Sequence, residues 1–220
     1  MSLHFIREMN RLNKHLVELS DTVEEQVGRS IKAMTALDKE SAEKVIGKDS
    51  GVDRAEIEME EDCLKLLALH QPVATDLRLI ISVLKINSDL ERIGDHAVII
   101  AEEALTLADL PNVEVPEELF ELSTQARMML KKSMLAFVES DLDLAKNVLE
   151  LGQGIRQLAQ KIHQGQVQSI KAAPENTEQH LSILKVCRQV QRIADHATNI
   201  AEDIIFLMSG DIIRHTKSIK

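Results

Sequence analysis

The sequence contains no tryptophan and no tyrosine, and its only aromatic rings besides histidine are four phenylalanines. A core without large rings has to be packed from Leu, Ile, Val, Met and Ala. Because the β-branched and aromatic residues that favour strands are not dominant in such a set, this composition favours helices. The absence of Trp and Tyr therefore predicts an all-α protein.

Cysteines and long apolar segments are equally scarce. Cys63 and Cys187 stand alone, without CxxC spacing, each in an apolar helical context. Buried reduced thiols are expected, and no disulfide framework. The N-terminal segment MSLHFIREMN is charged, and no apolar run approaches the ~18 residues that a membrane span needs. These absences predict a cytoplasmic chain that does not span a membrane.

Positive charge is in deficit, with a formal net charge of -10. Nucleic-acid partners are usually held by clustered Lys and Arg, so this balance disfavours them. The only basic bias lies in the tail from Arg214 to Lys220. With 44% hydrophobic and 28% charged residues, the chain has the composition of an ordinary folded domain.

Apolar residues recur at helical spacing along most of the chain. The second segment has its apolar positions at Val45, Val52, Ile57, Leu64 and Leu67, with interruptions near Gly47 and Gly51. The expected N-terminal caps are Ser41 for that segment, Thr75 with Asp76 for the third and Asn176 for the last. Six helices are predicted, over about residues 6–37, 41–70, 75–108, 117–139, 142–172 and 176–208.

An internal repeat becomes visible when the chain is aligned with itself at an offset of 100 residues. Ser82–Glu103 then matches Ser182–Asp203 without a gap, with 11 identities among 22 pairs. Each copy carries a heptad seam that is apolar throughout: Val83, Ile86, Leu90, Ile93, Ala97, Ile100, Ala104, Leu107, and Ile183, Val186, Val190, Ile193, Ala197, Ile200, Ile204, Leu207. This spacing is typical of helices crossing at the shallow angle of left-handed bundles.

The repeat predicts two tandem three-helix bundles. The first covers residues 1–108, and the second covers residues 117–209. A linker with two prolines, residues 109–116, separates them, and residues 210–220 form a C-terminal tail.

Two acidic pairs in the first repeat have i,i+4 spacing. Glu91 and Asp95 fall at positions b and f of the heptad, outside the seam, where they are expected to be exposed. Asp49 and Asp53 form the second pair. If the second and third helices are antiparallel, the pairs approach each other, and hard divalent or trivalent cations prefer such oxygen ligands. A solvated polar face is the alternative.

In the second copy this acidic pattern is eroded. Gln191 replaces the counterpart of Glu91, while Gly152 and Arg156 stand where Asp49 and Asp53 are matched. Asp195 is retained, and an arginine beside it would compete with a cation. Asymmetric sites are therefore predicted, with the first repeat the better metal binder.

Two further residue types recur in both copies of the repeat. His96 and His196 lie at position g beside the seam, which favours packing or hydrogen bonding over metal ligation. Arg92 and Arg192 are expected to form inter-helix or partner salt bridges.

Several of these segments resemble the signatures of the PhoU family: LERIGDHA, VQRIADHATNIAE, the turn HQPVATDLR and the closing GDIIRH. The resemblance covers almost the whole chain. It implies two related three-helix bundles and metal ligation by Asp49, Asp53, Glu91, Asp95 and Asp195, with iron, zinc, manganese or magnesium as the ion. Gln191, Gly152 and Arg156 depart from the family pattern and weaken the second site.

The resemblance also implies a function. Family members negatively regulate the phosphate-starvation response by contacting a sensor histidine kinase and the ATPase subunit of the high-affinity phosphate importer, and a homodimer is expected. The sequence contains no G-x-S-x-G, P-loop or HExxH motif, so no catalytic residue is assigned. The alternatives are a metal-dependent phosphoesterase and a helical scaffold without metal.

Overall fold

A computed structural model describes residues 3–213, which are helical almost throughout and contain no strand. The helices are α1 (Leu3–Ala36), α2 (Lys39–Ile46), α3 (Asp49–His70), α4 (Ala74–Ala108), α5 (Glu117–Glu139), α6 (Leu142–Ala172) and α7 (Thr177–Ser209), with a 3₁₀ turn, η1 (Pro174–Asn176), before α7. The all-α prediction is confirmed. None of these helices combines the length and apolar character that crossing a membrane requires.

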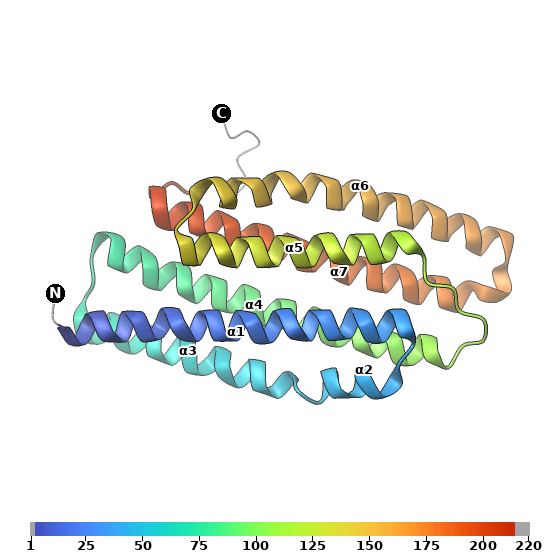
Figure 1. The fold of residues 1–220 in the computed structure, drawn as a ribbon, viewed down its shortest axis with the longest axis horizontal. Helices are drawn as coiled ribbons and strands as arrows, with labels where there is room; N and C mark the ends of the chain where they lie inside the picture. Colours follow the sequence, from blue (N-terminus) through green and yellow to red (C-terminus); the bar gives the residue numbers. More distant parts are fainter. Residues whose placement is uncertain (1–2, 214–220) are drawn as a thin grey trace.

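The helices form two elongated bundles that lie side by side (Figure 1). The first bundle consists of α1, the consecutive helices α2 and α3, and α4, while α5, α6 and α7 form the second. The repeated helices α4 and α7 pack against each other where the bundles meet, and α1 also packs against α5. The prediction of two three-helix repeats is confirmed.

The heptad seam of the repeat forms the centre of each bundle. All eight seam side chains of α4 are fully buried, and so are seven of the eight in α7. The exception, Leu207, is partly buried near the end of α7. Burial of these aliphatic side chains stabilises the fold by about 1.5–3 kcal/mol for each Leu, Ile or Val.

The predicted second helix is two helices. Asp38 caps α2, because its carboxylate accepts a hydrogen bond from the backbone N–H of Ser41, so the expectation of Ser41 as the cap is wrong. The α2 helix ends at Ile46, with Gly47 as its C-cap, and α3 starts at Asp49.

The buried face of α3 differs in part from the one predicted. Ile57 and Leu64, expected in the core, are 55% and 54% exposed. The buried positions of α3 are Val52, Met59, Cys63 and Leu66. Val52 is buried as predicted, so the error begins after it, where the predicted stripe followed Ile57 and Leu64 in place of Met59 and Cys63.

The expected cap of the third predicted helix is also wrong, whereas Asn176 occupies the N-cap position of α7, as predicted. Neither Val73 before α4 nor Asn176 before α7 makes a side-chain cap hydrogen bond. The hydroxyl of Thr75 instead accepts a hydrogen bond from Arg78, at 3.2 Å. In the turn that precedes α4, Gln71 has a left-handed backbone conformation, with φ 45°.

The two cysteines are buried and unpaired, as predicted. Burial raises the pKa of the Cys63 thiol to about 12 and that of the Cys187 thiol to about 11, so both are protonated at neutral pH. The basic segment from Arg214 to Lys220 lies outside the described residues. The domain boundaries at 108, 116 and 209 remain predictions.

Candidate metal centre

Three of the predicted ligands meet on one side of the first bundle. Asp49 and Asp53 come from the first turns of α3, and Asp95 comes from α4. One carboxylate oxygen from each lies within 4.8 Å of the others. The antiparallel arrangement of the two helices therefore produces the approach expected from the sequence, whereas metal binding there remains a prediction.

Local sequence explains why α3 can come so close to α4. A Cβ atom at Gly94 would lie 3.3 Å from Cγ1 of Val52 and 3.4 Å from Oε1 of Gln26. The absence of a side chain at Gly94 thus leaves room for the first turns of α3. At the start of α3, Asp49 also complements the positive end of the helix dipole.

The electrostatics of the cluster are unfavourable without a counter-ion. Burial raises the pKa of Asp49, and the charges of Asp53 and Asp95 raise it further, against a lowering by its hydrogen bond from Gln26. That bond, from Nε2 to the carboxylate, is 3.0 Å long. A bound cation would relieve the mutual repulsion of the carboxylates.

Glu91 borders this cluster without joining the three. Burial and the nearby charge of Asp95 raise its pKa, and Glu56 and Asp53 act in the same direction. The side chain of Glu91 is only 24% exposed and that of Asp95 37%, so the expectation that both are exposed is wrong. The reason is that α3 covers this face of α4.

Arg92 belongs to the same surface. Its guanidinium lies 3.4 Å from both the Glu91 and the Asp95 carboxylates, on its own helix. The described structure therefore shows pairing within α4 where an inter-helix salt bridge was expected. A cation at Asp95 would compete with this arginine. The Arg92 side chain is 60% exposed and has room to turn towards solvent.

The residues fit a hard cation. Three carboxylates from two rigid helices supply oxygen ligands of the type that Mg²⁺, Mn²⁺, iron and zinc accept. Beside them, Oε1 of Gln26 is buried and has no hydrogen-bond partner among the described residues. A buried acceptor next to carboxylates is destabilising by itself and is relieved by a nearby positive charge.

The second bundle has a different charge pattern at the matched positions. Burial raises the pKa of Asp195, and the charges of Arg156 of α6 and Arg192 of α7 only partly oppose that shift. Within residues 3–213, Asp195 belongs to no group of three potential metal ligands. Metal ligation by Asp195 therefore remains a prediction, and Arg156 opposes it.

Comparison with known proteins places the chain in a family. A model of the PhoU domain matches residues 16–104 and again residues 119–204. The chain belongs to the PhoU family. A phosphate-specific transport system accessory protein PhoU homolog from Pseudomonas putida is 34% identical over 218 residues, which covers 98% of this chain and 84% of the relative.

Solved PhoU structures agree in fold. PhoU from Pseudomonas aeruginosa superposes with a TM-score of 0.90 at 33% identity, covering 94% of this chain and 100% of that chain. The phosphate transport system regulatory protein PhoU from Streptococcus pneumoniae gives 0.89 at 29% identity, over 94% and 98% of the two chains. The recognition from sequence motifs is confirmed.

The repeated histidines of this PhoU chain lie between the bundles and not with the acids. The rings of His96 and His196 are 5.4 Å apart between centroids. Asp89 accepts a hydrogen bond from Nδ1 of His196 at 2.7 Å, whereas Nδ1 of His96 is buried and has no hydrogen-bond partner among the described residues. His196 therefore forms a hydrogen bond and His96 packs against its ring, so each histidine has one of the two expected roles.

A second group of potential metal ligands was missed by the sequence analysis. His4 and Glu8 of α1 and His70 at the end of α3 bring ligand atoms within 4.8 Å of one another. Nε2 of His4 lies 3.5 Å and Nε2 of His70 3.4 Å from the Glu8 carboxylate. The i,i+4 spacing of His4 and Glu8 was a usable signal, but the partner from α3 required knowledge of the fold.

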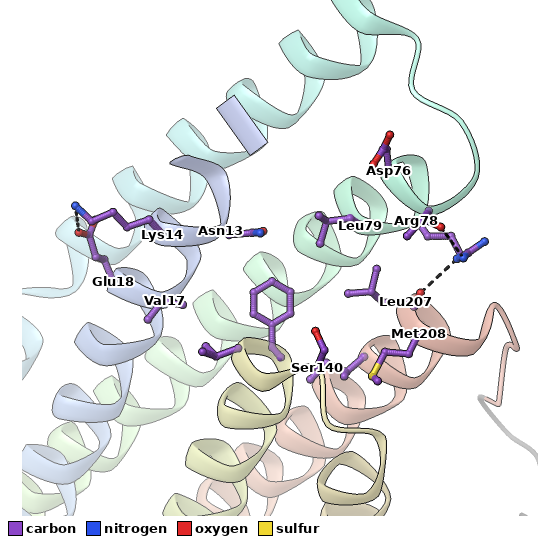
Figure 2. Close-up of a pocket in the computed structure, with 14 residues that line it drawn as sticks. Asn13, Lys14, Val17, Glu18, Asp76, Arg78, Leu79, Ser140, Leu207 and Met208 are labelled. Carbon is purple, nitrogen blue, oxygen red and sulfur yellow. Dashed lines mark hydrogen bonds and ion pairs between the residues drawn. The ribbon is translucent and has the colours of Figure 1, made fainter. Parts of the chain in front are cut away.

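An apolar cleft of about 720 Å³ opens where the two bundles meet at one end (Figure 2). Val17, Leu79, Phe137 and Leu207 lie along it, and Glu18 at the rim is paired with Lys14. No cysteine or histidine lines it, and no base lies against a nucleophile. The relatives of the chain are named as accessory and regulatory proteins.

Proposed function

We propose that this chain is a non-enzymatic regulator of phosphate uptake that acts as an adaptor between the importer ATPase and the sensor histidine kinase of the phosphate-starvation response. The observation that carries the proposal is the match of both PhoU repeats over nearly the whole chain to relatives named as phosphate transport accessory proteins. An accessory role in phosphate transport follows from that match. The proposal goes beyond that match in naming the importer ATPase and the sensor histidine kinase as the partners.

The shape of the molecule is compatible with an adaptor. Because α4 and α7 form the contact between the bundles, α2 and α3 lie on one side of the molecule and α6 on the other (Figure 1). Two partners can therefore be contacted at the same time through separate surfaces. The protein acts in the cytoplasm, where both partners expose their soluble domains.

Co-purification tests the adaptor role. The full chain, immobilised by a tag, is mixed with the purified importer ATPase and with the cytoplasmic part of the kinase, separately and together. Capture of each partner, and of both at once, is the expected result. A chain that captures neither would be a helical scaffold and would contradict the proposal.

The second part of the proposal is a divalent or trivalent cation, iron, zinc, manganese or magnesium, held by Asp49, Asp53 and Asp95 with Glu91 beside them. Elemental analysis of the purified chain tests it against a Glu91→Ala/Asp95→Ala variant and an Asp195→Ala variant. Metal lost only in the double variant supports a site in the first repeat. A further variant, His70→Ala, shows whether any of the metal belongs to the cluster of His4, Glu8 and His70.

The enzymatic alternative has a direct test. A phosphoester substrate is incubated with the chain and iron, zinc or manganese, and the rate is compared with that of the metal alone. The adaptor proposal expects no difference. Turnover that disappears in Asp95→Ala would contradict it.

The proposed assembly is a homodimer. Light scattering coupled to size-exclusion chromatography measures the mass directly. A mass of one chain across the working concentration range would contradict this part of the proposal alone.

A further inference from the structure

The second bundle carries a basic groove where the first carries its acidic cluster. A cavity of about 760 Å³ runs between α6 and α7. Its lining includes Arg156 and His163 from α6 and Lys185, Arg188 and Arg192 from α7, against a single carboxylate, Asp195. In a chain with a formal net charge of -10, five side chains that can carry a positive charge thus gather around one carboxylate.

The groove arises from charge inversion within the duplicated surface. Arg156 occupies the position matched to Asp53, Gln191 that of Glu91, and Arg188 that of Ser88. The counterparts of Arg92 and Asp95 are retained as Arg192 and Asp195. The same pair of helices thus presents oxygen ligands in one repeat and guanidinium groups in the other.

The three arginines of the groove form no ion pair with a carboxylate of the described residues. Over residues 3–213, Arg156, Arg188 and Arg192 have no carboxylate within 4.0 Å, in contrast to Lys185, which is bonded to Glu103. All three arginine side chains are exposed. Their donors are therefore available to a ligand, and each guanidinium offers a planar fork that matches two oxygens of a phosphate.

We propose that the groove between α6 and α7 binds a phosphate oxyanion, either inorganic phosphate or the phosphate group of a small molecule. Arg156, Arg188 and Arg192 supply the positive charge and the donors. The proposal goes beyond the adaptor role and does not depend on it, because it rests only on the groove and its charges. The volume lies within the range of small-molecule sites, about 300–1,000 Å³.

Asp195, the one carboxylate that lines the groove, can discriminate between phosphate and sulfate. Phosphate at neutral pH retains a P–OH group, which can donate a hydrogen bond to the carboxylate of Asp195. Sulfate carries no proton at that pH and would instead place its negative charge against that carboxylate. The groove is therefore expected to prefer phosphate to sulfate.

Calorimetric titration of the full chain tests the proposal, with inorganic phosphate, ADP and sulfate as separate titrants at low ionic strength. Wild type is expected to bind phosphate, and Arg156→Gln and Arg188→Gln to weaken binding by about tenfold each. Arg54→Gln is the matched control, because Arg54 is equally exposed but lies on α3. Asp195→Asn is expected to reduce the preference for phosphate over sulfate.

Two arms of the experiment separate the sources of the ligand. Binding of ADP tighter than that of phosphate assigns the groove to a phosphorylated small molecule, and equal or weaker binding of ADP assigns it to the free ion. The proposal is overturned if wild type binds neither, if sulfate binds as tightly as phosphate, or if Arg54→Gln weakens binding as much as Arg156→Gln. Far-UV circular dichroism verifies that each variant keeps its helices.

Discussion

Asp89 of α4 accepts two hydrogen bonds from α7, from Nδ1 of His196 at 2.7 Å and from Nδ2 of Asn199 at 3.2 Å, and so joins the two bundles. Asp89 is 9% exposed, so its charge depends on these donors. The matched position of α7 is Gln189, whose Oε1 is buried and has no hydrogen-bond partner among the described residues. The equivalent positions of the repeat are therefore unequal, because Asp89 bonds across to α7 while the Oε1 of Gln189 is left without such a bond.

Removing the charge of Asp89 is expected to loosen the contact between the bundles. Asp89→Asn should lower the free energy of unfolding by about 1.5–3 kcal/mol, the range for hydrogen bonds to charged groups. Urea unfolding followed by circular dichroism measures the change. The control is Asp21→Asn, which alters an exposed aspartate of α1 and should leave the stability within about 0.5 kcal/mol of wild type. Equal effects of the two substitutions would contradict the prediction.

The pH dependence of stability is expected to follow His96. Burial lowers its pKa from 6.5 to about 4, and the nearby charges of His196, Arg192 and Arg92 act in the same direction, against a raising effect of Gln189. The unfolded chain thus binds a proton at His96 between pH 6.5 and 4 that the folded chain does not. The contribution of His96 is therefore fully present above pH 6.5 and is lost as the pH falls towards 4.

Comparison with His96→Gln isolates this contribution. The difference in unfolding free energy between wild type and variant should decrease by about 1–2 kcal/mol from pH 7 to pH 4.5. The raised pKa values of Asp49 and Glu91 favour the folded state as the pH falls. Because both carboxyl groups are present in wild type and variant alike, their contribution cancels in this difference. A difference that is constant with pH would show that His96 takes up its proton equally in both states.

The sequence predicted the central helices well because their signal is local and duplicated. A seam of apolar residues at 3-4 spacing specifies a buried face wherever it packs, and the seams of α4 and α7 are buried accordingly. The break between α2 and α3 was underestimated because glycine at 47 is compatible both with a bent helix and with a helix end. Only the packing of the segment decides between them, and in the structure α2 ends at Ile46 and α3 begins at Asp49.

The candidate site was predictable in part for the same reason. The i,i+4 spacing places Asp49 beside Asp53, and a short turn before α4 makes the helices antiparallel, which brings Asp95 to them. The partial burial of Glu91 was not predictable, because a heptad position reports the face of one helix and not the neighbour that covers it. The groove of the second bundle required both the matched arginines and the cavity between α6 and α7.

A reciprocal pair of salt bridges was missed although its signal lay inside the repeat. Lys85 pairs with Asp203 at 3.2 Å, and Lys185 pairs with Glu103, which are the same two positions exchanged between α4 and α7. The lysine and the acid are 18 residues apart in each copy, so they share a helix face. Periodicity shows that the two residues share a face of one helix, but it does not show that this face of α4 packs against the matching face of α7.

The acidic cluster is expected to destabilise the protein when no metal is bound. In the presence of EDTA, Asp53→Asn should raise the melting temperature by about 1–3 °C, because it removes a charge that faces Asp49 and Glu91. In the presence of the metal found by elemental analysis, the order should reverse, since the variant lacks a ligand. Glu58→Gln, on the exposed face of the same helix, is the control and should not show this reversal.

The reciprocal salt bridges are expected to contribute more than surface pairs do. The Asp203 side chain is 2% exposed, so Lys85→Ala removes a cation from a buried carboxylate and should cost about 2–3 kcal/mol of unfolding free energy. Lys39→Ala removes the cation from an exposed pair with Asp109 and should cost less than about 1 kcal/mol. Urea unfolding of both variants gives the comparison. Similar costs would mean that solvent and its other neighbours stabilise the Asp203 carboxylate, and that Lys85 contributes little to the contact between α4 and α7.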